Sequence, residues 1–283
     1  MKILVLNDTS SYHSGCKQVM NVIRSQLAGH EVKFAKKVKA SVLEEFDVLI
    51  INGEGTMHDD AKKAKLLISL AEVAKQQGLK TLLINSVWQN NSVALTSRLT
   101  CFNYISVREI NSKHAITDVI DIPVDVNLDL SFYANTTSQK GPPCTVVTGN
   151  YSYKSPTSIA NPIKVDNFSS SINIFNEDWD SIVTTLRAAS VLVTGRHHEM
   201  YAACVARCPF VVLEGNTHKN SGLLDTYHLD IPVLPTNASV DEIKQALQGV
   251  HKYDKQFRIL FDLMHKKDMP NILDIIRDYN ASK

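Results

Sequence analysis

Short apolar runs alternate with amphipathic stretches along the first half of the chain. The runs of strand length are residues 3–6, 32–35, 47–52, 81–84 and, more weakly, 104–107 and 124–126. Helical periodicity is found between them, at about residues 17–27, 60–76 and 108–119. Parallel strands need long crossover connections, so this alternation predicts a parallel sheet with helices on both faces.

A second alternation follows a polar segment, residues 134–143, whose Gly and two Pro suit a linker. Its strand candidates are residues 145–148, 172–174, 191–193, 210–213 and 233–234, and its helix candidates are about 179–189, 198–206, 221–227 and 240–247. Residues 253–279 are helical in pattern and interrupted at Pro270. We therefore predict an α/β protein with two Rossmann-like doubly wound lobes, residues 1–133 and 134–283. The C-terminal helical tail could pack back on the first lobe.

Composition narrows the class of protein. A chain of 283 residues with 44% hydrophobic content can bury two medium cores, and a net charge of +1 argues against a general nucleic-acid-binding surface. The five cysteines form no CxxC pair, which fits a reducing cytoplasm better than a disulfide framework. No apolar run approaches the roughly 20 residues of a membrane span. We expect a cytoplasmic protein whose membrane association, if any, is peripheral.

Two basic turns follow neighbouring strand candidates and offer anion chemistry. The first, after residues 191–194, carries Arg196 and His198; the second, after residues 209–213, carries His218, Lys219 and Asn220. Turns at the carboxyl ends of parallel strands lie side by side, where helix N-termini present N–H groups to an anion. Arginine can hold a carboxylate or phosphate through two hydrogen bonds, and histidine can move a proton near neutral pH. The neighbouring His197 is expected to pack or to face solvent.

Other segments give weaker signals. The turn Gly53-Glu54-Gly55 lacks the third glycine of a dinucleotide-binding loop, but it allows close approach of a ligand to the backbone, and His58 follows it. His13 and Cys16 lie in the first loop after a strand, a position that commonly faces ligands in this architecture. Asp129 ends an extended run, and a structural hydrogen-bonding role is as plausible for it as a functional one.

Metal chemistry has no sequence signature in this chain. The pair His198-Glu199 begins like the zinc-protease pattern HExxH, but residue 202 is alanine, and no Walker A sequence is present. Paired cysteines and a clustered acidic motif are also absent from the sequence. We therefore expect neither a metal nor a cofactor to be required.

Taken together, these segments resemble the polysaccharide pyruvyl transferase family. The family's Gly-rich turn ending in histidine is matched loosely by residues 52–58, and its arginine-acid-serine segment by residues 106–112, with Arg108. The aspartate before the second lobe corresponds to Asp129, the RxH signature to Arg196 and His198, and the downstream lysine to Lys219. The loop of residues 11–16 departs from the family's usual asparagine, glycine and aspartate pattern.

The resemblance implies a fold like that of B-type (GT-B) glycosyltransferases, with the reaction between the lobes and the acceptor on the N-terminal side. It implies metal-independent transfer of pyruvate from phosphoenolpyruvate to a sugar hydroxyl, as a ketal, in capsule or lipopolysaccharide synthesis. His198, Arg196 and His13 would be catalytic. The substrate-binding residues would be Gly53, Glu54, Gly55, His58, Arg108, His218, Lys219 and Asn220.

Two alternatives remain open at this point. A glycosyltransferase that uses a nucleotide-activated acidic sugar, such as a CMP-linked donor, would need the same basic turns. A non-catalytic binding protein on this fold is the third class. In either enzymatic case the partners are a small anionic donor and a saccharide acceptor, while the oligomeric state stays open.

Overall fold

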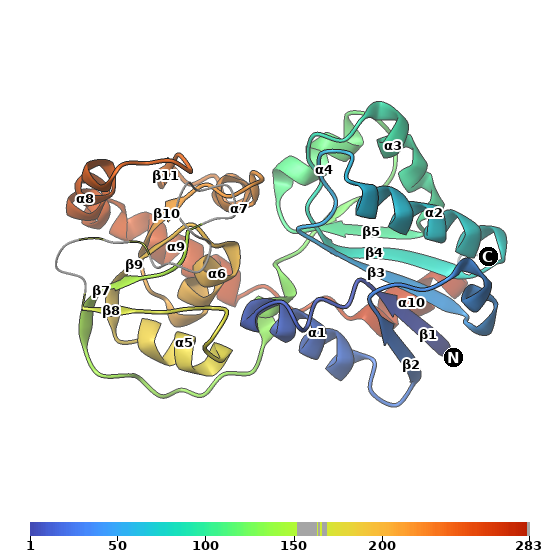
Figure 1. Ribbon diagram of the computed structural model, residues 1–283, viewed down its shortest axis with the longest axis horizontal. Coiled ribbons are helices and arrows are strands. Elements are labelled where there is room, and N and C mark those ends of the chain that lie inside the picture. Colours follow the sequence, from blue (N-terminus) through green and yellow to red (C-terminus); the bar gives the residue numbers. More distant parts are fainter. Residues whose placement is uncertain (152–162, 164, 166–168, 282–283) are drawn as a thin grey trace. The chain divides into compact units, whose positions relative to one another are not determined.

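The computed structural model describes residues 1–151, 163, 165 and 169–281 (Figure 1). The chain divides into two compact units. Unit 1 contains Met1–Thr9, Met20–Leu128 and Pro270–Lys283, and unit 2 contains Ser10–Val19 and Asp129–Met269. In these units the first loop belongs to unit 2 and the C-terminal residues belong to unit 1, whereas the boundary predicted from the sequence lies between residues 133 and 134.

Unit 1 is built on a six-stranded parallel sheet of order β2-β1-β3-β4-β5-β6. The strands are β1 (Lys2–Leu6), β2 (Glu31–Ala35), β3 (Val48–Glu54), β4 (Lys80–Ser86), β5 (Tyr104–Val107) and β6 (Asp125–Val126). Every residue of the central strand β3 is buried. This explains its continuous apolar run, because a parallel strand covered on both faces has no solvent side.

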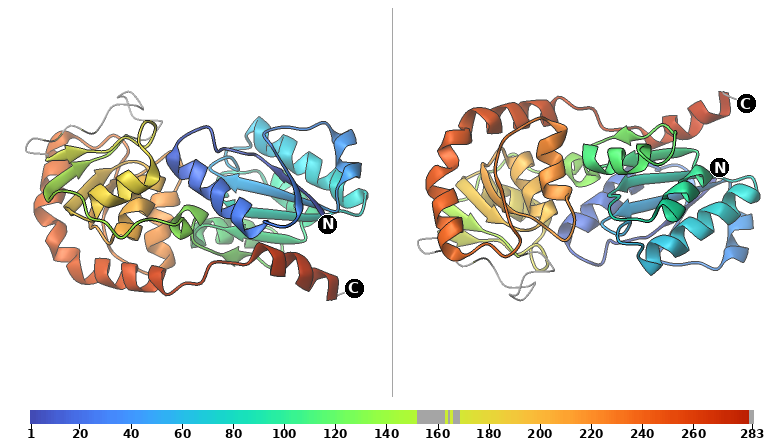
Figure 2. Two further views of the ribbon diagram at one scale, coloured as in Figure 1. Left: turned by 90° about the horizontal axis from the view of Figure 1, so that it is seen from below. Right: turned by 90° about the horizontal axis from the view of Figure 1, so that it is seen from above.

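The helices of unit 1 cover this sheet through apolar faces. They are η1 (Ala40–Glu45), α2 (Lys62–Gln76), α3 (Val93–Ser97), η2 (Arg98–Cys101), α4 (Ile110–Thr117) and α10 (Ile272–Ala281). Helix α2 buries Ala64, Leu67, Ile68 and Ala71, which share one helical face. Helix α10 lies beside the sheet of unit 1 (Figure 2), where Lys80 Nζ donates to the carbonyl of Ile276 at 2.6 Å.

Unit 2 is built on a five-stranded parallel sheet of order β11-β10-β9-β7-β8. The strands are β7 (Cys144–Thr148), β8 (Ser170–Ser171), β9 (Ala189–Thr194), β10 (Phe210–Leu213) and β11 (Val233–Leu234). The strand expected at residues 172–174 is observed two residues earlier, as β8. Ile172 and Ile174 are buried beyond its end, and Ile172 N still donates to the carbonyl of Thr148 in β7 at 2.9 Å.

The helices of unit 2 follow the expected alternation. They are η3 (Leu130–Tyr133), α5 (Trp179–Leu186), α6 (His197–Ala206), α7 (Lys219–Thr226), α8 (Val240–Gly249), η4 (Val250–Tyr253) and α9 (Asp254–His265). Helix α1 (Ser14–Gln26) starts three residues before the expected residue 17. The expected helical tail is divided: α9 belongs to unit 2, whereas α10 belongs to unit 1.

Both units have the same strand order about their first strand. In each sheet the second strand lies on one side of the first, and the third, fourth and fifth lie on the other side. Ligands of such open sheets bind beyond the carboxyl ends of the strands where the order reverses. In unit 1 this point lies between β1 and β3, and in unit 2 it lies between β7 and β9.

The described residues include no helix that is both long and apolar enough to cross a membrane.

Gly53 is required by the close packing of β3 on β4. A Cβ at Gly53 would lie 2.4 Å from Ser86 Oγ and 2.9 Å from Ser86 Cα, whereas a Cβ at Gly55 would meet nothing within 4 Å. We expect Gly53→Ala to lower the free energy of unfolding by about 1–3 kcal/mol through overpacking, measured by chemical denaturation. Gly55→Ala is the matched control and should change it little. Equal stability of the two variants would contradict this role of Gly53.

Glu199 is a buried carboxyl group that joins α6 to the ends of two strands of unit 2. Its Oε2 accepts hydrogen bonds from Asn150 N at 2.8 Å and from Thr194 Oγ1 at 2.5 Å. A Cβ at Gly149 would lie 2.1 Å from this oxygen, so glycine is needed there. Burial raises the pKa of Glu199 to about 7, against the opposing effect of these hydrogen bonds.

The raised pKa of Glu199 predicts a pH-dependent stability. Between the ordinary pKa of 4.5 and the folded value of about 7, the folded protein holds a proton that the unfolded chain has released. The free energy of unfolding therefore falls as pH rises through this window, by up to about 3 kcal/mol. Denaturation of wild type and Glu199→Gln at pH 5 and pH 8 isolates this contribution, because other titrating groups cancel. The variant should gain stability relative to wild type at pH 8; a difference independent of pH would refute the assignment.

Candidate active site

The turn between β9 and α6 lies at the strand-order reversal of unit 2 and carries three basic residues. Arg196 is the N-cap residue of α6, and its backbone N donates to Thr194 Oγ1 at 2.9 Å. His197 and His198 form the first turn of the helix and are both buried. The topology thus places the residues of this turn where open α/β sheets bind ligands.

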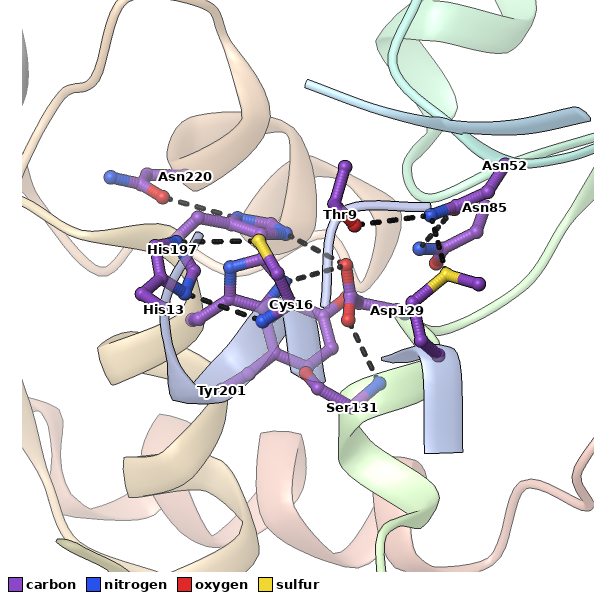
Figure 3. A network of polar contacts seen from close by, with 12 residues as sticks. Thr9, His13, Cys16, Asn52, Asn85, Asp129, Ser131, His197, Tyr201 and Asn220 are labelled. Atoms are coloured by element: carbon purple, nitrogen blue, oxygen red, sulfur yellow. Dashed lines mark hydrogen bonds and ion pairs between the residues drawn. The ribbon is translucent and has the colours of Figure 1, made fainter. Parts of the chain in front are cut away.

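A single buried carboxylate faces both histidines. Asp129 Oδ2 lies 3.5 Å from His198 Nε2. The same oxygen lies 3.9 Å from His197 Nε2 (Figure 3). Asp129 Oδ1 accepts from Ser131 N at 2.9 Å, and Asp129 N donates to the Tyr201 hydroxyl at 3.3 Å. These bonds fix the carboxylate against α6, and its negative charge stabilises an imidazolium formed beside it.

His197 connects the two basic turns. Its Nδ1 lies 3.2 Å from Asn220 Oδ1, and Asn220 Nδ2 donates to the carbonyl of Leu213 at 2.9 Å. Because the Asn220 amide nitrogen is used by Leu213, its oxygen is the acceptor, and His197 Nδ1 carries the proton. The two turns therefore lie side by side, as expected. His197 is packed rather than exposed, and it supports Asp129 as well.

The loop of residues 10–16 brings a third histidine to this place, although it lies far away in the sequence. Ser14 N and Ser14 Oγ both bond the carbonyl of Ile174, at 3.0 and 3.1 Å, which attaches the start of α1 to unit 2. A Cβ at Gly15 would lie 2.5 Å from His198 Cβ. Glycine at this position allows α1 to approach His198, so that the rings of His13 and His198 meet edge to face at 5.0 Å.

His13 is neutral at physiological pH. Burial lowers its pKa to about 2, helped by the nearby His198 and Arg196. Its Nδ1 accepts from Cys16 N at 3.3 Å, and its Nε2 lies 3.5 Å from Cys16 Sγ. Donor atoms of His13, Cys16 and His198 all lie within 4.8 Å of one another. A metal ion could be held here, although the sequence has no metal motif.

Phe175 supports the arginine of the first turn. The Arg196 guanidinium carbon lies 4.9 Å from the Phe175 ring centroid, a cation–π contact. The same ring packs against His13 at 5.6 Å and against Tyr12 at 5.7 Å. Arg196 is thus oriented by an aromatic cluster that also contacts His13.

The second basic turn differs from the expected anion site. The carboxylate of Glu214 accepts from Asn220 N at 3.3 Å and from Ser221 N at 3.2 Å. These N–H groups at the start of α7 therefore already bind an internal anion. Lys219 Nζ donates to Asn216 Oδ1 at 2.5 Å, and His218 is the N-cap residue of α7. An external phosphate would have to compete with Glu214 for the end of this helix.

Unit 1 has its own cluster at the strand-order reversal. Three non-glycine residues adopt positive φ at the ends of β1, β3 and β4: Asn7 (65°), Glu54 (40°) and Asn85 (54°). Asn7 Nδ2 donates to the carbonyl of Asn52 at 2.6 Å. Asn85 Nδ2 donates to Asn52 Oδ1 at 3.4 Å (Figure 3). Left-handed conformations of this kind often mark functional sites. The glycine turn could be recognised in the sequence, whereas these three amides could not.

The remaining candidates of unit 1 have structural contacts. Arg108 is buried, and its backbone N donates to the carbonyl of Ser86 at 2.9 Å. The next residue, Glu109, caps α4 through Ser112 N at 2.9 Å. His58 Nδ1 pairs with Asp59 Oδ2 at 2.8 Å in an adjacent loop. The arginine-acid-serine segment, residues 106–112, therefore caps helix α4.

Comparisons with known structures agree with this architecture. The chain is similar to spinosyn forosaminyltransferase SpnP, with 10% identity, a TM-score of 0.57 and full coverage of both chains. A ugt transferase from Siraitia grosvenorii in complex with UDP has 10% identity and a TM-score of 0.55, with 99% of each chain covered. The UDP-GlcNAc 2-epimerase from Neisseria meningitidis has 10% identity and a TM-score of 0.54, covering 96% of this chain and 95% of that one.

At these identities the likeness concerns the fold alone, which is GT-B-like. No curated protein sequence matches this chain. The family model for polysaccharide pyruvyl transferase matches residues 5–217, a span that includes the loop of His13, Asp129 and the RxH turn. Because this match spans most of the chain, the protein belongs to the polysaccharide pyruvyl transferase family and is a transferase.

Proposed function

We propose that this protein transfers a pyruvyl group from phosphoenolpyruvate to two hydroxyls of a sugar, as a ketal, in the synthesis of a cell-surface polysaccharide such as capsule or lipopolysaccharide. The observation that carries the proposal is the pairing of His198 with the buried Asp129, at 3.5 Å. Arg196 precedes His198 by two residues, as the N-cap residue of the same helix. This arrangement combines a proton carrier with an anion-binding fork.

Each residue has a role that its chemistry supports. Arg196, oriented by Phe175, can hold the carboxylate or the phosphate of the donor through two hydrogen bonds. His198 can deliver a proton, and Asp129 stabilises its charged form. His13 is neutral because its pKa is lowered to about 2 by burial, so it can line the site without repelling Arg196.

The reaction balances without a metal or a redox partner. One sugar hydroxyl adds to C2 of phosphoenolpyruvate and releases its proton, while C3 takes up a proton and becomes a methyl group. The C2–O bond to phosphate then breaks, and the second hydroxyl forms its bond to C2, releasing its own proton. The products are the pyruvate ketal and inorganic phosphate. His198 would supply the proton to C3 or to the departing phosphate.

We assign acceptor binding to unit 1. The amides of Asn7, Asn52 and Asn85 and the turn Gly53-Glu54-Gly55 surround its strand-order reversal, and amide and carboxylate groups suit the hydroxyls of a sugar. His58 and Arg108 are secondary candidates, given their structural contacts. Lys219 and His218 of unit 2 would contribute to donor binding beside Arg196, whereas Asn220 would act through its bond to His197.

Ligand selectivity separates this proposal from the nucleotide-sugar alternative. Binding to the folded state alone raises apparent stability by mass action, so melting temperature can be measured with phosphoenolpyruvate, cytidine monophosphate and uridine diphosphate. We expect stabilisation by phosphoenolpyruvate and release of inorganic phosphate when an acceptor saccharide is added. Selective stabilisation by a nucleotide would favour a glycosyltransferase, and no binding by any of the three would favour a different donor.

Replacement of Arg196 tests the anion-binding fork. Arg196→Lys keeps the charge but loses the two-pronged hydrogen bonding, so phosphoenolpyruvate binding should weaken by about 1.5–3 kcal/mol, measured by calorimetric titration. Arg207→Lys is the matched control, because Arg207 pairs with Asp262 on an exposed surface of the same unit. Unchanged binding by Arg196→Lys would remove this residue from the donor site.

The proton-transfer role of His198 predicts a separation of turnover from binding. His198→Asn should lower kcat by about 100-fold or more and leave donor affinity nearly unchanged, both measured at a temperature at which the variant is folded. His197→Asn should have a smaller effect, since His197 lies farther from Asp129 Oδ2 and its other nitrogen is bonded to Asn220. The reverse order of the two effects would identify His197 as the proton donor.

A further inference from the structure

We infer that His13, Cys16 and His198 form a binding site for a zinc-like divalent cation. The three residues each offer one donor atom, and these atoms lie within 4.8 Å of one another. Two of the donors are imidazole nitrogens and one is a thiol sulfur. Borderline-soft cations such as Zn²⁺ and Co²⁺ favour this set, whereas Mg²⁺ and Ca²⁺ favour oxygen ligands.

The spacing of two donors already fits tetrahedral coordination. Zn–N and Zn–S bonds of about 2.0 and 2.3 Å, at a tetrahedral angle, separate nitrogen from sulfur by about 3.5 Å. His13 Nε2 and Cys16 Sγ lie 3.5 Å apart. A cation could bridge this pair without movement of the backbone, and His198, whose donor nitrogen lies within 4.8 Å of both atoms, would supply the third ligand.

The fold holds these residues together before any ion binds. His13 and Cys16 face one another across the start of α1, where Cys16 N bonds His13 Nδ1 at 3.3 Å. Ser14 is bonded to Ile174, and Gly15 allows direct packing of this turn on His198. Since all of these residues belong to unit 2, the donor set lies within one compact body.

The local charges also permit a cation. Asp129 lies 3.5 Å from His198 Nε2, and Cys16 would bind as the thiolate, so two negative charges would surround the ion. Arg196 opposes it, since its charge already lowers the pKa of His13. The neutral His13 needs no proton removed, but coordination through Nε2 requires the proton on Nδ1, so the long bond from Cys16 N would be exchanged for a metal–ligand bond.

Occupation of this site would stop catalysis. A histidine nitrogen that binds a metal cannot carry a proton at the same time, so a bound cation and proton transfer by His198 exclude one another. The protein would then turn over without metal and be inhibited by zinc. This consequence rests on the proposed function, whereas the binding site itself does not.

Cobalt binding tests the site independently of activity. Co²⁺ added to the metal-free protein should give a thiolate-to-cobalt charge-transfer band with one ion per chain, and Zn²⁺ should displace it. Cys16→Ser should lose the band. His13→Gln should weaken Zn²⁺ binding by more than about 100-fold, because loss of a residue that only supports a metal ligand typically costs about 10–100-fold. Cys144→Ser, which alters a half-buried cysteine of β7, is the matched control and should keep the band.

A wild-type protein that gives no thiolate band would overturn the proposal, and so would a band that survives in Cys16→Ser. The melting temperatures of the variants, measured without metal, show whether each is folded. Turnover assays then separate the two proposals. Each protein is compared with its own rate after chelation, and zinc should inhibit wild type at lower concentration than Cys16→Ser. Inhibition without Cys16 dependence would contradict the site, and loss of turnover on chelation would contradict metal-free catalysis but not metal binding.

Discussion

The buried carboxylate of Asp129 is the interaction on which the candidate site depends. A fully buried charge is costly unless polar partners surround it, and the Asp129 carboxylate meets this need through Ser131 N and both histidines of α6. Removing one partner of such a buried pair typically costs about 3–5 kcal/mol. The same contacts that make the charge tolerable therefore fix His198 in one position, and structure and chemistry share the same residues.

A second constraint is close approach at two glycines of unit 2. Gly15 lets the start of α1 pack on His198, and Gly149 leaves room for the Glu199 carboxylate. A side chain at either position would collide with a residue of the first turn of α6. The helix that carries the basic turn is thus held from two sides, by a loop from the N-terminus of the chain and by the segment after β7.

Periodicity was sufficient to predict the two parallel α/β sheets, because buried parallel strands such as β3 are apolar throughout. It could not predict that the loop of residues 10–19 belongs to unit 2, since that depends on the bonds of Ser14 to Ile174, 160 residues away. The same limit applies to the site. Arg196, His198 and Asp129 could be named as candidates from the sequence, whereas the contact of Asp129 with both histidines, the bond of His197 to Asn220 and the Glu214 cap of α7 depend on tertiary contacts.

The three histidines of this site show how environment divides one residue type into different roles. His13 is kept neutral by burial and by the positive charges nearby, so it can accept a hydrogen bond or bind a metal. His197 has its Nδ1 proton fixed by Asn220, whose own amide is fixed by Leu213. His198 faces the Asp129 carboxylate and packs against His13. The same type of side chain therefore has different partners at each of the three positions. A proton delivered to a substrate beside Arg196 would come from His198, whose partner is the Asp129 carboxylate. The neutral His13 adds no second positive charge beside His198.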